Sequence, residues 1–272
     1  MSRTPPPLTG APSDGLPLII GHRGDSAHAP ENTMAAFGLA LEAGADGVEF
    51  DVRLARDGAP VVIHDRTLER TALRPGFVEE ITSAELAGVR VGEWFNRRFT
   101  DCARPDFARE HVPTLTELFE RFGRSFKTLY VEMKGEDGAR LARLAAAVVA
   151  AVREHSLESS AVVKCFAHEA IAEVKRLAPE IRTAALFERS LARPVVPAAR
   201  IVRQALACGA DEVSLHHTLA RRAVVEAARA RGLGVVVWTV DSPAWLARAR
   251  SYGLRAVITN DPALMRAASL SR

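Results

Sequence analysis

The chain has 272 residues, of which 48% are apolar and 25% are charged, and its formal net charge is +3. These values are ordinary for a globular protein, and a chain of this length folds without disulfide staples. Basic residues are interleaved with acidic ones rather than clustered, so we expect no nucleic-acid partner. We expect the weak positive excess to reflect a solvated, arginine-rich surface, and mild attraction of an anionic substrate is the alternative.

Residues 1–15 are rich in proline and predict a disordered tail ahead of a single folded domain at 16–272. The tail has no apolar run of signal-peptide length, and no later stretch is long enough to cross a membrane. The widely spaced Cys102, Cys165 and Cys208 lack a zinc-type pattern, which favours a reducing compartment. We therefore expect a cytoplasmic protein without stable membrane insertion, whose oligomeric state is open.

Short apolar runs alternate with amphipathic segments from residue 16 onward. The first part of the chain holds three expected strands, at residues 16–21, 47–52 and 61–63. A helix with apolar residues at helical spacing is expected between the first two, over 32–43. The dipeptide Asp57-Gly58 between the last two is a strong hairpin signal.

Residues 66–112 interrupt this rhythm. The segment holds the aromatic residues Trp94, Phe95, Phe99 and Phe107. It predicts an insertion after the second barrel strand, packed over one end of the fold, with a short helix near 82–88.

The regular alternation returns after the insertion. Six further strands are expected at 128–133, 161–166, 183–187, 212–215, 235–240 and 256–259. Helices flank them at 114–122, 139–155, 168–178, 197–208, 220–231, 243–251 and 261–269. Without the hairpin strand the strands number eight, which predicts an α/β fold of the TIM-type (β/α)8 barrel class. An open doubly wound sheet is the alternative, but no GxGxxG pattern follows the first strand.

Charged residues gather where barrel strands are expected to end, which is the mouth where active sites lie. Glu49 and Asp51 are two residues apart on one strand, so their side chains point the same way. Neighbouring carboxylates repel each other, and a cation removes that cost. With Glu132 from the next barrel strand they predict an oxygen site for Mg²⁺ or Ca²⁺. Ion pairs, of Glu49 and Asp51 with nearby arginines and of Glu132 with Lys134, are the alternative.

The expected hairpin returns His64 to the mouth beside Glu49 and Asp51, opposite His22. Two histidines beside a metal site can serve in turn as base and acid. A single histidine at a strand end is usually structural, whereas the complete set indicates catalysis. Arg23 and Lys134 are suited to holding a phosphate.

Several short motifs follow one another in a fixed order. They are His22-Arg23-Gly24, Pro30-Glu31-Asn32-Thr33, Gly44-Ala45-Asp46-Gly47-Val48-Glu49-Phe50-Asp51-Val52, Asp57-Gly58, Val61-Val62-Ile63-His64-Asp65, Leu68-Glu69-Arg70-Thr71, Val112-Pro113-Thr114-Leu115, Glu132-Met133-Lys134, Trp238-Thr239-Val240 and Thr259-Asn260-Asp261-Pro262. Over residues 17–266 this series resembles the glycerophosphodiester phosphodiesterase family, in its bacterial, cytoplasmic type. Asp25, Cys165-Phe166 and residues 72–75 depart from the usual pattern and bear on substrate preference.

The resemblance implies a mechanism and its products. Metal ligation falls to Glu49, Asp51 and Glu132, and acid–base catalysis to His22 and His64. The glycerol 2-hydroxyl attacks phosphorus while one histidine takes its proton and the other protonates the leaving alkoxide. Water then opens the cyclic phosphate, which gives glycerol 3-phosphate and an alcohol such as choline or ethanolamine.

The remaining site residues are expected to act around this centre. Arg23 and Lys134 neutralise the phosphoryl group, and Trp238 lines the mouth against glycerol or a cationic leaving group. Glu31 and Asn32 support the site.

Two other functions stay open at this point. The first is a phosphodiesterase for lysophospholipid or phosphoinositide-like substrates, which the 66–112 insertion would receive. The second is a protein that binds glycerophosphodiesters without turnover, which has no need of two titrating histidines. The sequence chooses neither Mg²⁺ over Ca²⁺ nor the alcohol released.

Overall fold

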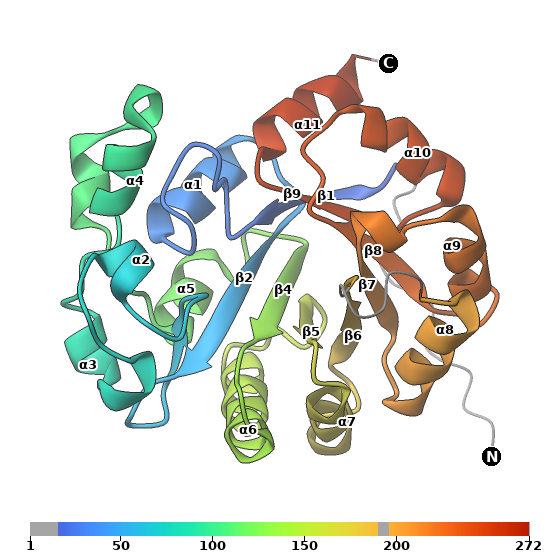
Figure 1. The fold of residues 1–272 in the computed structure, drawn as a ribbon, viewed down its shortest axis with the longest axis horizontal. Helices are drawn as coiled ribbons and strands as arrows, with labels where there is room; N and C mark the ends of the chain where they lie inside the picture. The colour runs from blue at the N-terminus through green and yellow to red at the C-terminus, as the bar shows by residue number, and fades with distance from the viewer. Residues whose placement is uncertain (1–15, 190–195, 272) are drawn as a thin grey trace.

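The computed structural model describes residues 16–189 and 196–271 (Figure 1). The tail expected at residues 1–15 lies outside the described residues. Eight parallel strands close into a barrel, because β1 (Leu18–His22) pairs with both β2 (Gly47–Leu54) and β9 (Ala256–Thr259). Between them stand β4 (Thr128–Met133), β5 (Ala161–Cys165), β6 (Arg182–Phe187), β7 (Glu212–His216) and β8 (Gly234–Trp238). The predicted (β/α)8 barrel is confirmed.

Amphipathic helices surround the barrel and bury their apolar sides against the outer face of the strands (Figure 1). They are α1 (Met34–Glu42), α5 (Leu115–Phe122), α6 (Gly138–Glu154), α7 (His168–Leu177), α8 (Ala198–Ala207), α9 (Arg222–Arg229), α10 (Ala244–Tyr252) and α11 (Pro262–Leu270). The Thr114 side chain caps α5 in a capping box with Glu117. No helix in the described part of the chain has the length and apolar character that crossing a bilayer requires.

The hairpin places one wall of the site. Strand β3 (Pro60–Val62) pairs antiparallel with the end of β2, and Gly58 supplies the positive φ (+83°) of the turn. Because of this pairing β2 continues to Leu54, beyond the end expected at residue 52. The main-chain N–H of Ile63 donates to the Asp51 carbonyl (2.9 Å), so His64 follows at the mouth.

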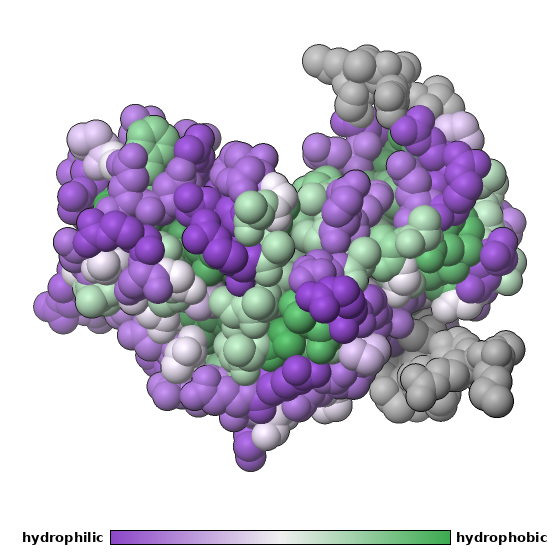
Figure 2. All heavy atoms as spheres, turned by 90° about the horizontal axis from the view of Figure 1, so that it is seen from below, coloured by the Kyte–Doolittle hydropathy of each residue, from purple (hydrophilic) through white to green (hydrophobic). Residues whose placement is uncertain are grey.

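Residues 66–112 form a group of short helices beside α1. They are α2 (Glu69–Ala72), α3 (Ser83–Leu86), α4 (Glu93–Arg98) and the 3-10 turns η1 (Val78–Glu80), η2 (Thr100–Cys102) and η3 (Pro105–Arg109). Phe95 and Phe107 pack on Ala29 and Ala36, which fixes this insertion to α1 and the loop before it. The surface is hollowed between the insertion and the opposite side of the barrel (Figure 2).

The barrel interior is apolar in its middle and charged at both ends. Ile20, Val162 and Val236 belong to the central apolar layer. At the end of the barrel opposite the mouth, the buried Glu212 accepts a hydrogen bond from the Tyr130 hydroxyl (2.8 Å) and pairs with Arg255 (2.8 Å). Burial raises the pKa of Glu212 despite the nearby guanidinium groups.

Replacement of Glu212 tests this cluster. We expect Glu212→Ala to lower the free energy of unfolding by about 3–5 kcal/mol, because Arg255 is left buried without its carboxylate. Urea denaturation measures the change. The control Glu226→Ala removes an exposed carboxylate on α9, and its effect should stay below about 0.5 kcal/mol. Equal losses in the two variants would contradict a structural role for the buried pair.

Candidate active site

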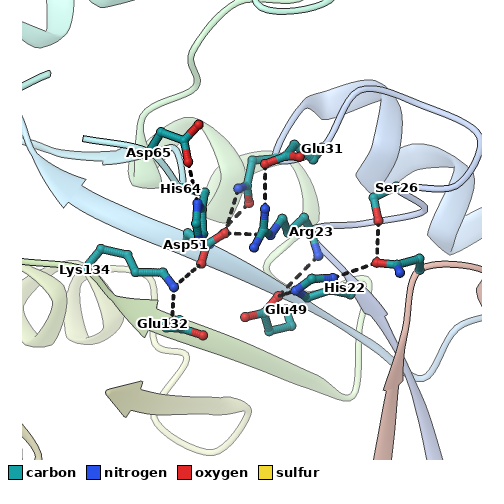
Figure 3. A network of polar contacts seen from close by, with 12 residues as sticks. His22, Arg23, Ser26, Glu31, Glu49, Asp51, His64, Asp65, Glu132 and Lys134 are labelled. Atoms are coloured by element: carbon teal, nitrogen blue, oxygen red, sulfur yellow. Dashed lines mark hydrogen bonds and ion pairs between the residues drawn. The ribbon is translucent and has the colours of Figure 1, made fainter. Parts of the chain in front are cut away.

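Three carboxylates converge at the mouth of the barrel. Glu49 and Asp51 come from β2 and Glu132 from β4, and each offers an oxygen within 4.8 Å of the others (Figure 3). All three residues are buried. The β2–β4 register pairs Asp51 with Glu132, so neighbouring strands carry these side chains at the same level.

This carboxylate cluster fits a divalent cation. Glu49 Oε1 and Glu132 Oε1 are buried; each contacts a lysine ammonium group but accepts no hydrogen bond of normal geometry from the described residues. Carboxylate oxygens are the ligands that Mg²⁺ and Ca²⁺ prefer. The predicted ligands are therefore together, and the structure leaves the choice between the two ions open.

Positive side chains from three strands compensate the carboxylates. Lys134 contacts Glu132 and lies 3.2 Å from Asp51 Oδ1, and Arg23 Nε lies 3.1 Å from Asp51 Oδ2. Lys164 Nζ lies 2.8 Å from Glu49 Oε1. Burial opposes ionisation, but Lys164 holds the pKa of Glu49 below its usual value, and Arg23 and Lys134 do the same for Asp51.

His22 is fixed by a chain of hydrogen bonds from the far end of the sequence. The Asn260 amide donates to Asp241 Oδ2 (2.8 Å), so its Oδ1 is left to accept from His22 Nδ1 (2.7 Å) and from the Ser26 hydroxyl (3.0 Å). His22 Nδ1 therefore carries a proton, and Nε2 lies 3.8 Å from Glu49 Oε2. A neutral His22 thus presents an unprotonated Nε2 to the carboxylate cluster.

His64 is held in the same way by a carboxylate. Its Nδ1 lies 2.6 Å from Asp65 Oδ1, and Arg70 donates to the other oxygen of Asp65 (2.6 Å). His64 lies beside Asp51 (Figure 3). Its Nε2 makes no hydrogen bond within the described residues and remains available for proton transfer.

Glu31 and Asn32 join the network behind Arg23 and Asp51. Glu31 accepts hydrogen bonds from Arg23 (2.7 Å) and from both terminal nitrogens of Arg70 (2.7 and 2.8 Å). The Asn32 amide donates to Asp51 Oδ2 (2.9 Å), and its oxygen accepts from the Asp51 main chain (3.2 Å). Asn32 has a left-handed backbone (φ +58°), which asparagine tolerates well.

A hollow of about 500 Å³ opens beside His22 and Arg23, and Trp94, Phe99 and Asn260 also line it. Trp238 does not line this hollow. It lies at the end of β8 against Phe166 and His216, with ring centroids 5.8 and 5.2 Å apart. The predicted mouth residues are thus divided between the hollow on the insertion side and the aromatic group of Phe166, His216 and Trp238.

Four further residues at the site had no assigned role in the sequence analysis. They are Lys164, Asn260, Asp65 and Arg70. Lys164 carries a detectable signal, since it is the one charged residue in the apolar run Ala161–Cys165. Asn260, Asp65 and Arg70 lie within the quoted motifs. The contacts of Asn260 with His22 and of Arg70 with Glu31 are distant in sequence, so no local pattern shows them, whereas Asp65 lies next to His64 in the chain.

Arg70 donates hydrogen bonds to both Glu31 and Asp65, so its contribution to the free energy of unfolding should depend on pH. Burial acts to raise the pKa of both, but hydrogen bonds from Arg70, with Arg23 or His64, hold each pKa below its usual value. A carboxylate whose pKa is lower in the folded than in the unfolded protein stabilises the fold fully above the unfolded-state pKa, which is about 4. This stabilisation is lost as the pH falls from there through the folded-state pKa.

We therefore expect the destabilisation caused by Arg70→Met to be largest near pH 7 and to shrink as pH falls through about 4. Urea denaturation with EDTA, at about pH 7 and pH 3.5, measures it. The control Arg97→Met removes an exposed arginine of α4. If Arg70→Met lowers the free energy of unfolding equally at both pH values, the stabilising pairs of Arg70 with Glu31 and Asp65 are contradicted.

Comparison with known proteins places this geometry in a family. The model of the glycerophosphoryl diester phosphodiesterase family matches residues 22–264. A glycerophosphodiester phosphodiesterase of Caldanaerobacter subterraneus subsp. tengcongensis is 34% identical over 252 residues, which cover 90% of this chain and 94% of that protein.

Solved structures agree with the sequence comparison. A phosphodiesterase of Oleispira antarctica, in complex with the product sn-glycerol-3-phosphate, has a TM-score of 0.80 and 27% identity, covering 94% of this chain and 98% of that one. The glycerophosphodiester phosphodiesterase of Agrobacterium tumefaciens has a TM-score of 0.75 and 29% identity, covering 93% and 100%. The chain therefore belongs to the glycerophosphoryl diester phosphodiesterase family.

Proposed function

We propose that this chain hydrolyses glycerophosphodiesters to glycerol 3-phosphate and an alcohol, with a divalent cation and two acid–base histidines. The observation that carries the proposal is the convergence of three buried carboxylates with His22 and His64, each tied at Nδ1. The Oleispira antarctica phosphodiesterase, whose structure holds sn-glycerol-3-phosphate, supports the product.

The two histidines move protons in turn. As the glycerol 2-hydroxyl oxygen attacks phosphorus, Nε2 of one histidine accepts its proton, and the other histidine protonates the departing alkoxide. The bond from phosphorus to the alcohol breaks as the bond to the 2-oxygen forms, which leaves a cyclic phosphate. Water then opens the ring with the roles exchanged, so both histidines regain their starting protonation states.

Glu49, Asp51 and Glu132 would hold the cation. In that place a divalent cation would supply Lewis-acid stabilisation of negative charge on the phosphoryl group and would favour ionisation of a nearby hydroxyl. Arg23 and Lys134 are each about one-sixth exposed, so both can reach a phosphoryl oxygen at the mouth while remaining beside Asp51. Their positive charge favours the phosphoryl group as negative charge develops on it.

Release of glycerol 3-phosphate from glycerophosphocholine and glycerophosphoethanolamine tests the proposal. We expect release with Mg²⁺ or Ca²⁺, its loss with EDTA, and a fall in kcat of about 100-fold or more in His64→Ala, because proton transfer is removed. The control His155→Ala alters a histidine on the outer helix α6. Release that survives both EDTA and His64→Ala would overturn the mechanism.

A second candidate substrate class has its own observation. A hollow of about 760 Å³ is lined by Leu73, Trp94, Phe99 and three arginines of the insertion, and it shares Trp94 and Phe99 with the hollow beside His22. Leu73 and Phe99 are exposed there. An apolar surface next to the active site is suited to the hydrocarbon chain of a lysophospholipid.

Leu73 separates the two substrate classes, because it lines the larger hollow and not the one beside His22. We expect Leu73→Asn, which suits the left-handed backbone at this position (φ +55°), to lower kcat/KM for a lysophospholipid about tenfold. One buried leucine contributes roughly 1.5–3 kcal/mol to binding. The kcat/KM for glycerophosphocholine should stay the same in this variant. Leu270→Asn, on the exposed end of α11, is the control. If Leu73→Asn changes kcat/KM equally for both substrates, Leu73 does not bind the hydrocarbon chain.

A further inference from the structure

Lys164 is a charged side chain enclosed beneath the carboxylate cluster. Its side chain is 2% exposed, and Nζ lies 2.8 Å from Glu49 Oε1 and 3.2 Å from Glu132 Oε2. The residue that pairs with it on β6 is the small Ala184. The ammonium group thus contacts two of the three predicted metal ligands from inside the barrel.

The positively charged side chains of Arg23, Lys134 and Lys164 differ in how far they can move. Arg23 and Lys134 are partly exposed and can turn toward solvent or toward a phosphate. Lys164 has no such route, because a buried ammonium that leaves its carboxylates loses its compensation. Its charge therefore stays beside Glu49 and Glu132 whichever ligand occupies the mouth.

The charges of the cluster balance without any metal ion. Arg23, Lys134 and Lys164 bring three positive charges to Glu49, Asp51 and Glu132, and Glu31, which also pairs with Arg23, has Arg70 as a second cation. Protein cations therefore compensate the buried carboxylates. A divalent ion that binds the same oxygens then meets the fixed positive charge of Lys164 at close range. Lys164 and the metal ion thus compete for the same negative charge.

We propose that Lys164 is a built-in counter-cation that holds Glu49 and Glu132 in place without metal and weakens the affinity of the site for a divalent ion. The inference rests on the proposed metal site. It assigns Lys164 a positioning role, since its enclosed ammonium acts on the reaction through the two carboxylates. Easier release of the ion follows from it.

Metal binding measured directly tests this role. Metal-free protein is titrated calorimetrically with Mg²⁺ and with Ca²⁺, and thermal unfolding is followed with EDTA and with saturating metal. The variants are Lys164→Met, which keeps the length of the chain, and Lys164→Gln, which keeps a hydrogen-bond donor. The control is Lys127→Met, an exposed lysine paired with Asp46.

We expect both Lys164 variants to bind the ion at least about tenfold more tightly than the unmodified protein, and the control to match it. Without metal, both variants should unfold at a lower temperature, and added metal should raise Tm more in them than in the unmodified protein. If Lys164→Met does not fold, the Gln variant decides the question.

The possible failures can be told apart. If the unmodified protein binds metal and both variants bind it with equal or weaker affinity, the role of Lys164 is overturned and the metal site stands. If neither the unmodified protein nor either Lys164 variant binds Mg²⁺ or Ca²⁺, the metal site of the proposed function is overturned, and this inference with it.

Discussion

Repulsion among Glu49, Asp51 and Glu132 is the constraint on which the mouth of this barrel depends. Burial of three carboxylates within 4.8 Å of one another is unfavourable unless positive charge surrounds them. That charge arrives from the ends of β1 and β4, which both pair with β2, and from β5, which pairs with β4. The β1–β2 pairing closes the barrel, so closure is the step that brings Arg23 to Asp51.

The same constraint explains the ties on the two histidines. His22 and His64 stand close to carboxylates, which would draw an untethered imidazole ring into an ion pair. Asn260 and Asp65 hold each ring at Nδ1, which leaves Nε2 for the proton transfers that we propose. The two ties differ in charge, because Asn260 is a neutral amide and Asp65 a carboxylate. Each tie is in turn held by another side chain, Asp241 for Asn260 and Arg70 for Asp65.

Local patterns in the sequence predicted the barrel and most of its mouth. The spacing of Glu49 and Asp51 fixes their common side, and Asp57-Gly58 fixes the return of His64, since both depend on a few neighbouring residues. The contact of Asn260 with His22 spans 238 residues, and that of Lys164 with Glu49 depends on the barrel register. Such contacts leave no periodic signal. The extension of β2 to Leu54 has a local cause, since it arises from pairing with β3, and the Asp57-Gly58 signal located the turn without giving the strand ends.

Aromatic side chains lie on two sides of the charged cluster at the mouth of the barrel. The charged side chains of the site gather in the central cluster, where each has at least one partner. On one side, the insertion offers Trp94 and Phe99 beside arginines, and on the other Trp238 packs with Phe166 and His216. Two of these rings also contact cations of the charge network, because Arg70 lies over Trp94 (5.5 Å to the ring centroid) and Lys134 over Phe166 (5.9 Å). The aromatic surfaces and the charge balance are therefore coupled at Arg70 and Lys134, so a substitution of either ring is expected to act on a counter-charge of the carboxylates as well.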